Sequence, residues 1–195
     1  MPPEVLFSAR VGVGMGGVLM QHMSQDRREE IVPLDGALEQ LRRLIGTFGA
    51  GNVRIISYMG ARMATHYAHQ LAQPGGFLQL AGMDASNLHI IQDRDKFACL
   101  KSLHIEYFID DSVSVVEPLL LETDRRADLQ ETHAGLYPGP LLCVLVPTVR
   151  AGNVVDPIER HRHYVAQHRG GRLVLAAGLT EAVTRIIEHS TSEAR

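Results

Sequence analysis

The sequence predicts an α/β fold, with a doubly wound, mainly parallel sheet and helices on both faces of that sheet. Short apolar runs of strand length alternate with segments whose apolar residues recur at helical spacing. Glycine and proline separate most of these segments. Strands that alternate with helices are joined by right-handed crossovers and therefore form a parallel sheet. The chain has 195 residues, 45% of them hydrophobic, so we expect one domain over residues 1–195.

The first half of the chain carries three predicted strands and two predicted helices. The apolar runs of strand length are residues 10–13, 53–57 and 88–91. The segments with helical spacing between them are residues 35–48 and 63–71. Asp35 is the expected cap of the first helix, and Pro74 with two following glycines ends the second. This half therefore predicts two crossovers between parallel strands.

The second half continues the same alternation. Its apolar runs are residues 107–109, 141–146 and 172–176. Its expected helices are residues 93–103, 113–121 and 180–189, with a further helix that starts at Asp156 and Pro157. Pro118 is expected to kink or shorten its helix. We expect the polar stretch of residues 122–139 to be a loop with room for one helical turn.

Composition excludes several classes of protein. Lys and Arg number 19 against 22 Asp and Glu, a net charge of −3, so we expect no nucleic-acid partner. The two cysteines, Cys99 and Cys143, cannot build a disulfide framework, which favours a cytoplasmic location. No apolar run approaches the roughly 20 residues of a membrane span. The N-terminus does not have the pattern of a signal peptide.

Glycines and polar residues follow the predicted strands, where parallel sheets bind their ligands. The residues concerned are Gly14, Met15, Gly16 and Gly17 after the first strand, Ser57 after the second, Lys96 after the third, and Asp110 and Asp111 after the fourth. Because the carboxyl ends of parallel strands share one edge of the sheet, we expect these residues to lie close together.

In order and spacing, these segments resemble the motif set of the haloacid dehalogenase superfamily of phosphotransfer enzymes. In that superfamily the first strand ends in Asp-x-Asp-Gly-Val or a close variant, and the second ends in Ser or Thr. A Lys precedes the fourth strand, which ends in an acidic pair. Ser57, Lys96 and the pair Asp110-Asp111 match the last three motifs. The resemblance covers about residues 10–146, and the elements of residues 156–189 would extend the same domain.

The first motif departs from the superfamily pattern, because Gly14 and Gly16 stand where both aspartates belong. In the superfamily the first Asp is the nucleophile and a magnesium ligand, and the second protonates the leaving group. Glycine supplies a carbonyl oxygen but no carboxylate. Loss of a covalent nucleophile costs about a million-fold in turnover. The resemblance therefore implies that phosphohydrolase activity is absent or vestigial.

The resemblance implies a binding, regulatory or assembly protein without a cap domain. Only about 40 residues separate Gly14 from Ser57, and a similar number separate Ser57 from Lys96, too few for a sizeable cap. Superfamily members without caps have open sites, and they act on large substrates or close the site by oligomerising. We therefore expect a homodimer, with a small phosphorylated ligand or a protein partner at the site. An enzyme of different chemistry in the same pocket is the alternative.

Removal of two aspartates favours binding of an anion without a metal. The hydroxyl of Ser57, the ammonium of Lys96 and the backbone N–H groups of residues 14–18 remain. Consecutive N–H groups in a glycine-rich turn form an anion-binding nest. The hypothesis is therefore that phosphate, sulfate or a phosphorylated ligand binds here without magnesium.

Magnesium binding is weakened in this pattern. Asp110 and Asp111 remain as possible ligands, but a hard cation needs several oxygen ligands and one carboxylate has been lost. Lys96 is either a phosphate-binding cation, a surface lysine or the partner of Asp110 in an internal ion pair. Ser57 either binds phosphate or merely ends a strand. One of the two aspartates, or Ser112, is expected to cap the next helix.

A dinucleotide site is a weaker alternative. Gly12-x-Gly14-x-x-Gly17 matches the dinucleotide fingerprint letter for letter. This interpretation requires a helix over residues 18–30 and a strand over residues 31–34, followed by Asp35 as the ribose acceptor. Pro33 argues against a central strand there.

Overall fold

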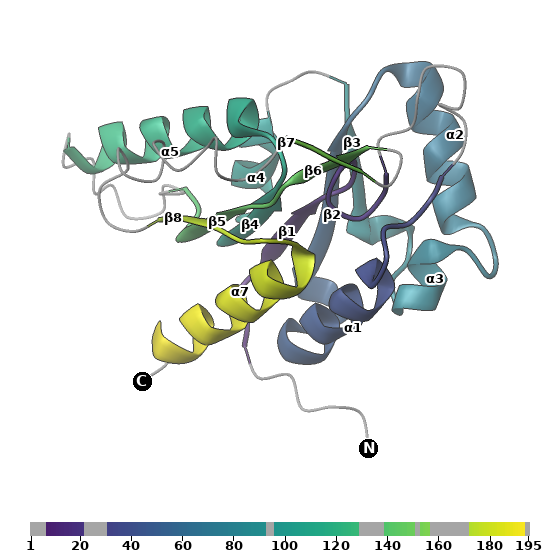
Figure 1. Ribbon diagram of the computed structural model, residues 1–195, viewed down its shortest axis with the longest axis horizontal. Helices are drawn as coiled ribbons and strands as arrows, with labels where there is room; N and C mark the ends of the chain where they lie inside the picture. Colours follow the sequence, from purple (N-terminus) through teal and green to yellow (C-terminus); the bar gives the residue numbers. More distant parts are fainter. Residues whose placement is uncertain are drawn as a thin grey trace.

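The computed structural model describes residues 7–21, 31–92, 96–128, 139–150, 153–156 and 172–193. The strands are β1 (Val11–Gly14), β2 (Val53–Tyr58), β3 (Leu88–Ile91), β4 (Tyr107–Asp110), β5 (Leu142–Leu145), β6 (Thr148–Arg150), β7 (Asn153–Asp156) and β8 (Leu173–Leu175). The α-helices are α1 (Ala37–Phe48), α2 (Ala61–Ala72), α3 (Phe77–Ala81), α4 (Lys96–Ser102), α5 (Val113–Asp128) and α7 (Leu179–Glu193). Two short 3₁₀ turns are η2 (Ala50–Asn52) and η3 (Ala85–Asn87). Figure 1 shows the sheet between layers of helix, which confirms the predicted α/β fold.

The main sheet has six strands in the order β3-β2-β1-β4-β5-β8, and every neighbouring pair is parallel. From β1 the chain passes outward to β2 and β3. It then crosses back to β4 and continues in the opposite direction to β5 and β8. The direction therefore reverses between β1 and β4, and a reversal of this kind opens a ligand crevice at the carboxyl ends of the strands.

The register brings the ends of the central strands level. Gly14 of β1 lies opposite Ile56 of β2, and Val13 lies opposite Ile109 of β4. The residue after each of these positions is therefore at the same edge of the sheet. The predicted strands 53–57 and 107–109 are confirmed, each one residue longer at its carboxyl end.

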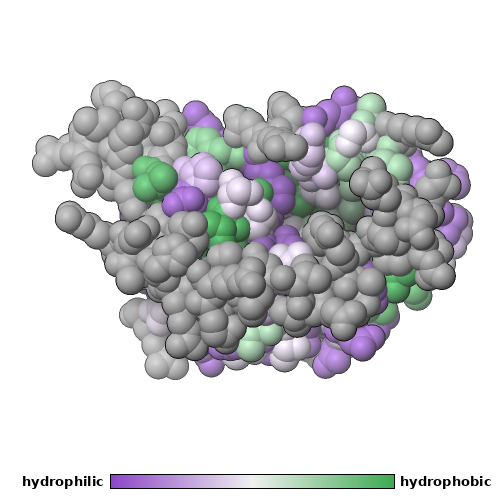
Figure 2. All heavy atoms as spheres, turned by 45° about the horizontal axis from the view of Figure 1, so that its top comes forward, coloured by the Kyte–Doolittle hydropathy of each residue, from purple (hydrophilic) through white to green (hydrophobic). Residues whose placement is uncertain are grey.

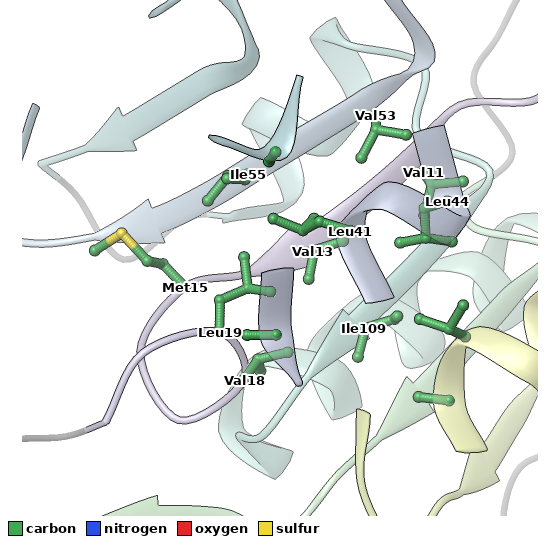
Figure 3. Close-up of a cluster of buried hydrophobic side chains, with 14 of the residues drawn as sticks. Val11, Val13, Met15, Val18, Leu19, Leu41, Leu44, Val53, Ile55 and Ile109 are labelled. Carbon is green, nitrogen blue, oxygen red and sulfur yellow. The ribbon is translucent and has the colours of Figure 1, made fainter. Parts of the chain in front are cut away.

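Helices cover both faces of the sheet with separate apolar clusters. On one face, Leu41 and Leu44 of α1 pack over Val11 and Val13 of β1 (Figure 3). The helices α3 and α7 contribute to the same cluster. The other cluster joins residues of α4 and α5 to the opposite side of the central strands, namely Leu100, Val116, Leu119, Ile56 and Phe108. This two-sided burial explains why the central strands are apolar at nearly every position.

The start of α1 differs from the prediction. The helix begins after Gly36, whose φ of 75° is left-handed, and no side chain caps it. Asp35 is therefore not the N-cap, and that prediction is wrong. The backbone makes the turn instead, since Ala37 N–H donates to the Leu34 carbonyl. Glycine tolerates this left-handed conformation, so the sequence Asp35-Gly36 forms a turn.

Helix α5 is longer than the sequence indicates. It runs through Pro118 to Asp128, so the predicted loop is wrong for residues 122–128. Val116, Leu119 and Leu120 on this helix are buried against the sheet. Their packing offsets the hydrogen bond that proline removes from a helix.

Two short elements went unpredicted. The helix α3 follows Gly76, and its residues Phe77 and Leu78 are buried. The strands β6 and β7 pair antiparallel as a hairpin directly after β5. Asp156 ends β7, and the rest of the helix expected to begin there lies outside the described residues. Between strands of the main sheet, the described segments carry only helices, turns and this hairpin, with no cap domain.

The geometry required for the dinucleotide alternative is not found in the described part of the glycine segment. Residues 18–21 form a turn and an isolated bridge rather than the start of a helix. Pro33 makes only an isolated antiparallel bridge with Met20, so residues 31–34 form no strand of the main sheet. The neighbour of β1 is β2, which begins at Val53. The spacing of glycines therefore matches the fingerprint without its strand–helix–strand context.

Candidate functional site

The glycine-rich segment after β1 is a tightly hydrogen-bonded turn. The carbonyl of Met15 accepts hydrogen bonds from the N–H groups of Leu19 and Met20, each at 2.9 Å. The N–H of Gly17 donates to the Met20 carbonyl at 2.7 Å, and its φ of 76° requires glycine. Val18, Leu19 and Met20 are buried in the core, and Figure 3 shows Val18 and Leu19 beside Val13. Burial of these side chains holds the backbone of residues 14–17 in place.

Within this turn, three backbone N–H groups remain available. The N–H groups of Met15, Gly16 and Val18 donate no hydrogen bond to any part of the chain that the structure describes. Buried or half-buried N–H groups without a protein partner favour a bound anion or water. The turn is therefore chemically suited to hold an oxyanion.

The carboxylate of Asp110 is held at the end of β4 by two groups. Its oxygen Oδ2 lies 2.6 Å from Nζ of Lys96, and its Oδ1 accepts a hydrogen bond from Ser112 N–H at 2.9 Å. The backbone carbonyl of Asp110 accepts from Val146 N–H at 3.0 Å. The contact with Ser112 forms a turn that leads into α5, and the cap expected from the sequence at Asp110, Asp111 or Ser112 stays a prediction.

Lys96 and Asp110 form a buried ion pair, which confirms one of the three interpretations of Lys96. Their side chains are 12% and 1% exposed. Lys96 is the first residue of α4, and its ammonium also lies 5.8 Å from the ring centre of Phe108. Burial raises the pKa of Asp110, and the charge of Lys96 opposes that rise. Each charge therefore depends on the other for compensation.

The absence of a side chain at Gly14 is what lets Asp110 approach β1. A Cβ at Gly14 would lie 3.0 Å from Asp110 Oδ2 and 3.2 Å from both the Ile109 carbonyl oxygen and Cγ2 of Val18. The Asp110 carboxylate thus fills the space into which a side chain at position 14 would project. Gly14 and the ion pair are structurally linked for this reason.

Ser57 and Asp111 complete the edge. Ser57 follows Ile56, which is level with Gly14, so the hydroxyl lies beside the turn at the end of β1. Ser57 is buried. Asp111 is also buried, and its backbone carbonyl accepts a hydrogen bond from Thr148 Oγ1 at 3.2 Å. The structure therefore brings Gly14, Lys96 and Asp110 together. It places the other sequence-predicted residues at the same edge of the sheet, namely Met15, Gly16, Gly17, Ser57 and Asp111.

The site residues do not fit a resident magnesium ion. Magnesium requires near-octahedral coordination by oxygen. Both oxygens of Asp110 already accept from Lys96 or Ser112, and the glycines offer no carboxylate. Among the described residues, no group of three or more His, Cys, Asp or Glu side chains could hold a metal ion. The ammonium of Lys96 is instead the cation that faces Asp110.

Sequence reasoning missed the hairpin of β6 and β7 beside this site. Thr148, the first residue of β6, is joined through its hydroxyl to the backbone of Asp111. Residues 147–156 contain no strand-length apolar run, so no signal in the sequence pointed to this hairpin. Figure 2 shows hydrophilic and hydrophobic residues intermixed at the middle of the face that comes forward from the top of Figure 1.

Comparison with known proteins gives no relative for this chain. No protein-family model matches it, and no curated protein shows significant similarity to it. Within the described residues, no helix is long and apolar enough to cross a membrane.

Proposed function

We propose that this protein is a catalytically degenerate relative of the haloacid dehalogenase phosphatases that binds a phosphorylated ligand without hydrolysing it. The observation that carries the proposal is the buried Lys96–Asp110 ion pair beside Gly14. The position of the superfamily nucleophile holds no side chain, and the cation near it is an ammonium of the protein. Such a site retains groups that attract an anion and lacks the carboxylate that would form a phosphoenzyme.

Three groups support binding of a phosphate oxyanion at this edge. The N–H groups of Met15, Gly16 and Val18 supply neutral donors from the turn. The Ser57 hydroxyl supplies another, and Lys96 supplies positive charge with ammonium hydrogens beyond the one that Asp110 accepts. Hydrogen bonds from charged donors to oxyanions are about twice as strong as neutral ones. Lys96 is therefore the residue whose removal should weaken binding most.

Calorimetry with inorganic phosphate tests the proposal. The expected result is phosphate binding in the presence of a chelator, weakened at high salt because charge-assisted contacts are screened. The double variant Lys96→Met with Asp110→Asn removes both charges, which avoids leaving a buried carboxylate unpaired, and should abolish binding. Lys101→Met, an exposed lysine at the other end of α4, is the matched control and should bind as the unaltered protein does.

The same protein should show no magnesium-dependent hydrolysis of a phosphate monoester above background. Two results would refute the proposed function: phosphate binding that requires magnesium, or robust turnover that Asp110→Asn abolishes. Turnover of that kind would instead support an enzyme that uses the same pocket.

We further propose that the open edge of the sheet is covered in a homodimer and that the protein works in the cytoplasm. No cap domain covers the carboxyl edge in the described residues, and a second copy is the simplest cover for it. Neither Cys99 nor Cys143 forms a disulfide among the described residues, and Cys143 is buried in β5, where burial raises the pKa of its thiol. Two cysteines outside any disulfide agree with a reducing compartment.

A further inference from the structure

Tyr58 is the one exposed aromatic side chain in the part of the chain that the structure describes. It is the last residue of β2, and it is 42% exposed, whereas the rest of that strand is buried or half-buried. The other aromatic side chains of the described residues are also buried or half-buried, namely Phe7, Phe48, Tyr67, Phe77, Phe97, Tyr107 and Phe108. Tyr58 therefore presents a large apolar surface at the carboxyl edge of the sheet.

The strand register places Tyr58 beside the proposed anion site. Ile56 of β2 lies opposite Gly14 of β1, so Tyr58 stands two residues beyond that level. With neighbouring strands about 4.8 Å apart and a rise of about 3.3 Å per residue, the Cα atoms of Gly14 and Tyr58 are about 8 Å apart. The turn of residues 14–18 begins at this level and is therefore next to Tyr58.

Tyr58 also shares a face of the sheet with the ion pair of the site. Side chains alternate between the two faces along a strand, so Tyr58 projects on the side of Ile56, which packs with α4 and α5. Lys96 begins α4, and its ammonium lies 5.8 Å from the ring centre of Phe108 in the same cluster. The strand order puts β1 between the strand of Tyr58 and the strand of Asp110. A ligand that lies across β1 on this face can therefore reach both Lys96 and Tyr58.

The position of Tyr58 distinguishes it from the other exposed apolar residues. Single apolar side chains on a protein surface are common and need no explanation. The other large ones that are exposed in the described residues are Leu80 in α3, Leu121 in α5 and Leu141 before β5. None of these three follows the carboxyl end of a strand in the main sheet. Tyrosine is also well suited to a binding surface, because its rigid ring gives a large contact area at a low cost in conformational entropy.

We propose that Tyr58 selects phosphate esters that carry a planar ring, by stacking that ring on its own. This inference rests on the proposed function, because the turn of residues 14–18 and Lys96 must hold the phosphate. Aromatic rings attract one another in offset-stacked or edge-to-face arrangements beyond the effect of their buried area. An ester without a ring makes only the phosphate contacts and binds more weakly.

The spacing indicates how the ring and the phosphate are joined. The turn and Tyr58 are separated by one strand and two residues, so a compact linker is enough to connect a phosphate at the turn to a ring on Tyr58. A nucleoside monophosphate has this form, with a sugar as the linker. An aryl phosphate, in which the ring is joined directly to the phosphate oxygen, is the smaller ligand of the same class.

Calorimetry in the presence of a chelator tests the preference for a ring. Adenosine monophosphate is compared with the phosphate ester of ribose, which has the same sugar and phosphate and no ring. The expected result is that adenosine monophosphate binds about tenfold more tightly, within the range measured when one base stacks on one aromatic side chain. Phenyl phosphate is the aryl probe, and the ring-bearing ester that gains more over the ribose ester identifies the linker.

Variants at Tyr58 show whether its ring causes the preference. Tyr58→Phe keeps the ring and should retain the ratio of the two affinities. Tyr58→Leu removes the ring and should bring the ratio close to one. Leu121→Ala removes an exposed apolar side chain eight residues into α5 and is the matched control, which should keep the ratio of the unaltered protein.

Nuclear magnetic resonance reports the stacking without any substitution in the protein under test. The ring protons of Tyr58, assigned by comparison with Tyr58→Phe, should move upfield when adenosine monophosphate binds and should move little with the ribose ester. If inorganic phosphate and both esters fail to bind, the proposed function is wrong and this inference fails with it. If phosphate binds and the two esters have equal affinities, or if the preference survives undiminished in Tyr58→Leu, this inference alone is overturned.

Discussion

Gly14 shows how one missing side chain organises the site. Gly14 has no side chain, and this leaves space for the Asp110 carboxylate beside β1. Asp110 then requires a cation, and Lys96 supplies it. These three residues from three segments of the chain therefore depend on one another. A substitution at one of them changes how much a substitution at another destabilises the protein.

Substitution of Gly14 by alanine should destabilise the protein by about 1–3 kcal/mol, because the new Cβ would press on Asp110 and on the backbone of Ile109. Gly46→Ala is the matched control. Gly46 lies inside α1, and a Cβ there meets nothing within 4 Å, so this change should stabilise by about 0.5–1 kcal/mol. Urea unfolding measures both. Equal effects of the two substitutions would contradict the close packing at Gly14.

Removal of Lys96 alone should be costly. Lys96→Met leaves the Asp110 carboxylate buried without its partner, which costs about 3–5 kcal/mol. Adding Asp110→Asn should restore most of the lost stability, because it removes the buried charge and the amide oxygen still accepts a hydrogen bond from Ser112 N–H. Lys101→Met should change stability by no more than about 0.5 kcal/mol. If the double variant is as unstable as the single one, the ion pair is not the cause.

Acid should lessen the defect of Lys96→Met. Burial raises the pKa of Asp110, and loss of Lys96 removes the effect that opposed this rise. The folded state of the variant then binds a proton more tightly than the unfolded state, so its stability increases as the pH falls toward the unfolded pKa of about 3.9. Urea unfolding of the variant and of the unaltered protein measures the free energy of unfolding over this pH range. The difference between the two proteins should become smaller as the pH falls. If this stability difference grows as the pH falls, Asp110 is not a charged, buried carboxylate in the variant.

At the scale of elements, the sequence predicts the strands of the main sheet well and the ends of two helices poorly. The strands β2, β3 and β4 are predicted within a residue at each end, because their burial on both faces makes them continuous apolar runs. The start of α1 was missed because a backbone turn at Gly36 precedes the helix, and the end of α5 was missed because it depends on packing against the sheet. Gly36 replaces a side-chain cap, and buried leucines carry α5 past Pro118.

Pro118 should destabilise α5. It lies inside the helix and is exposed, so it removes a backbone hydrogen bond without adding buried contacts. Pro118→Ala should therefore stabilise the protein by about 1–2 kcal/mol, less than the full helix cost of proline because the unfolded chain also gains freedom. Thermal unfolding measures the change. A lower melting temperature would indicate that the proline ring has a packing role.

Most of the candidate site could be predicted from the sequence. Strand order and register bring Ser57, Lys96 and Asp110 to one edge, as parallel-sheet topology requires. Neither the hairpin of β6 and β7 nor its contact with Asp111 follows from local pattern.

At the scale of the whole molecule, the open carboxyl edge leads to a prediction about assembly. Light scattering at micromolar concentration should give about twice the monomer mass of 21.5 kDa. A mass that stays at the monomer value would contradict the homodimer and would leave the edge open to a large partner.

The proposed site binds an anion through the ammonium of Lys96 and not through a metal ion. A crystal structure of the protein soaked with phosphate and magnesium tests this claim most directly. The predicted result is phosphate against the turn of residues 14–18, with the Lys96–Asp110 pair intact and no magnesium on Asp110. Magnesium bound to the Asp110 carboxylate, with Lys96 displaced from it, would contradict the claim.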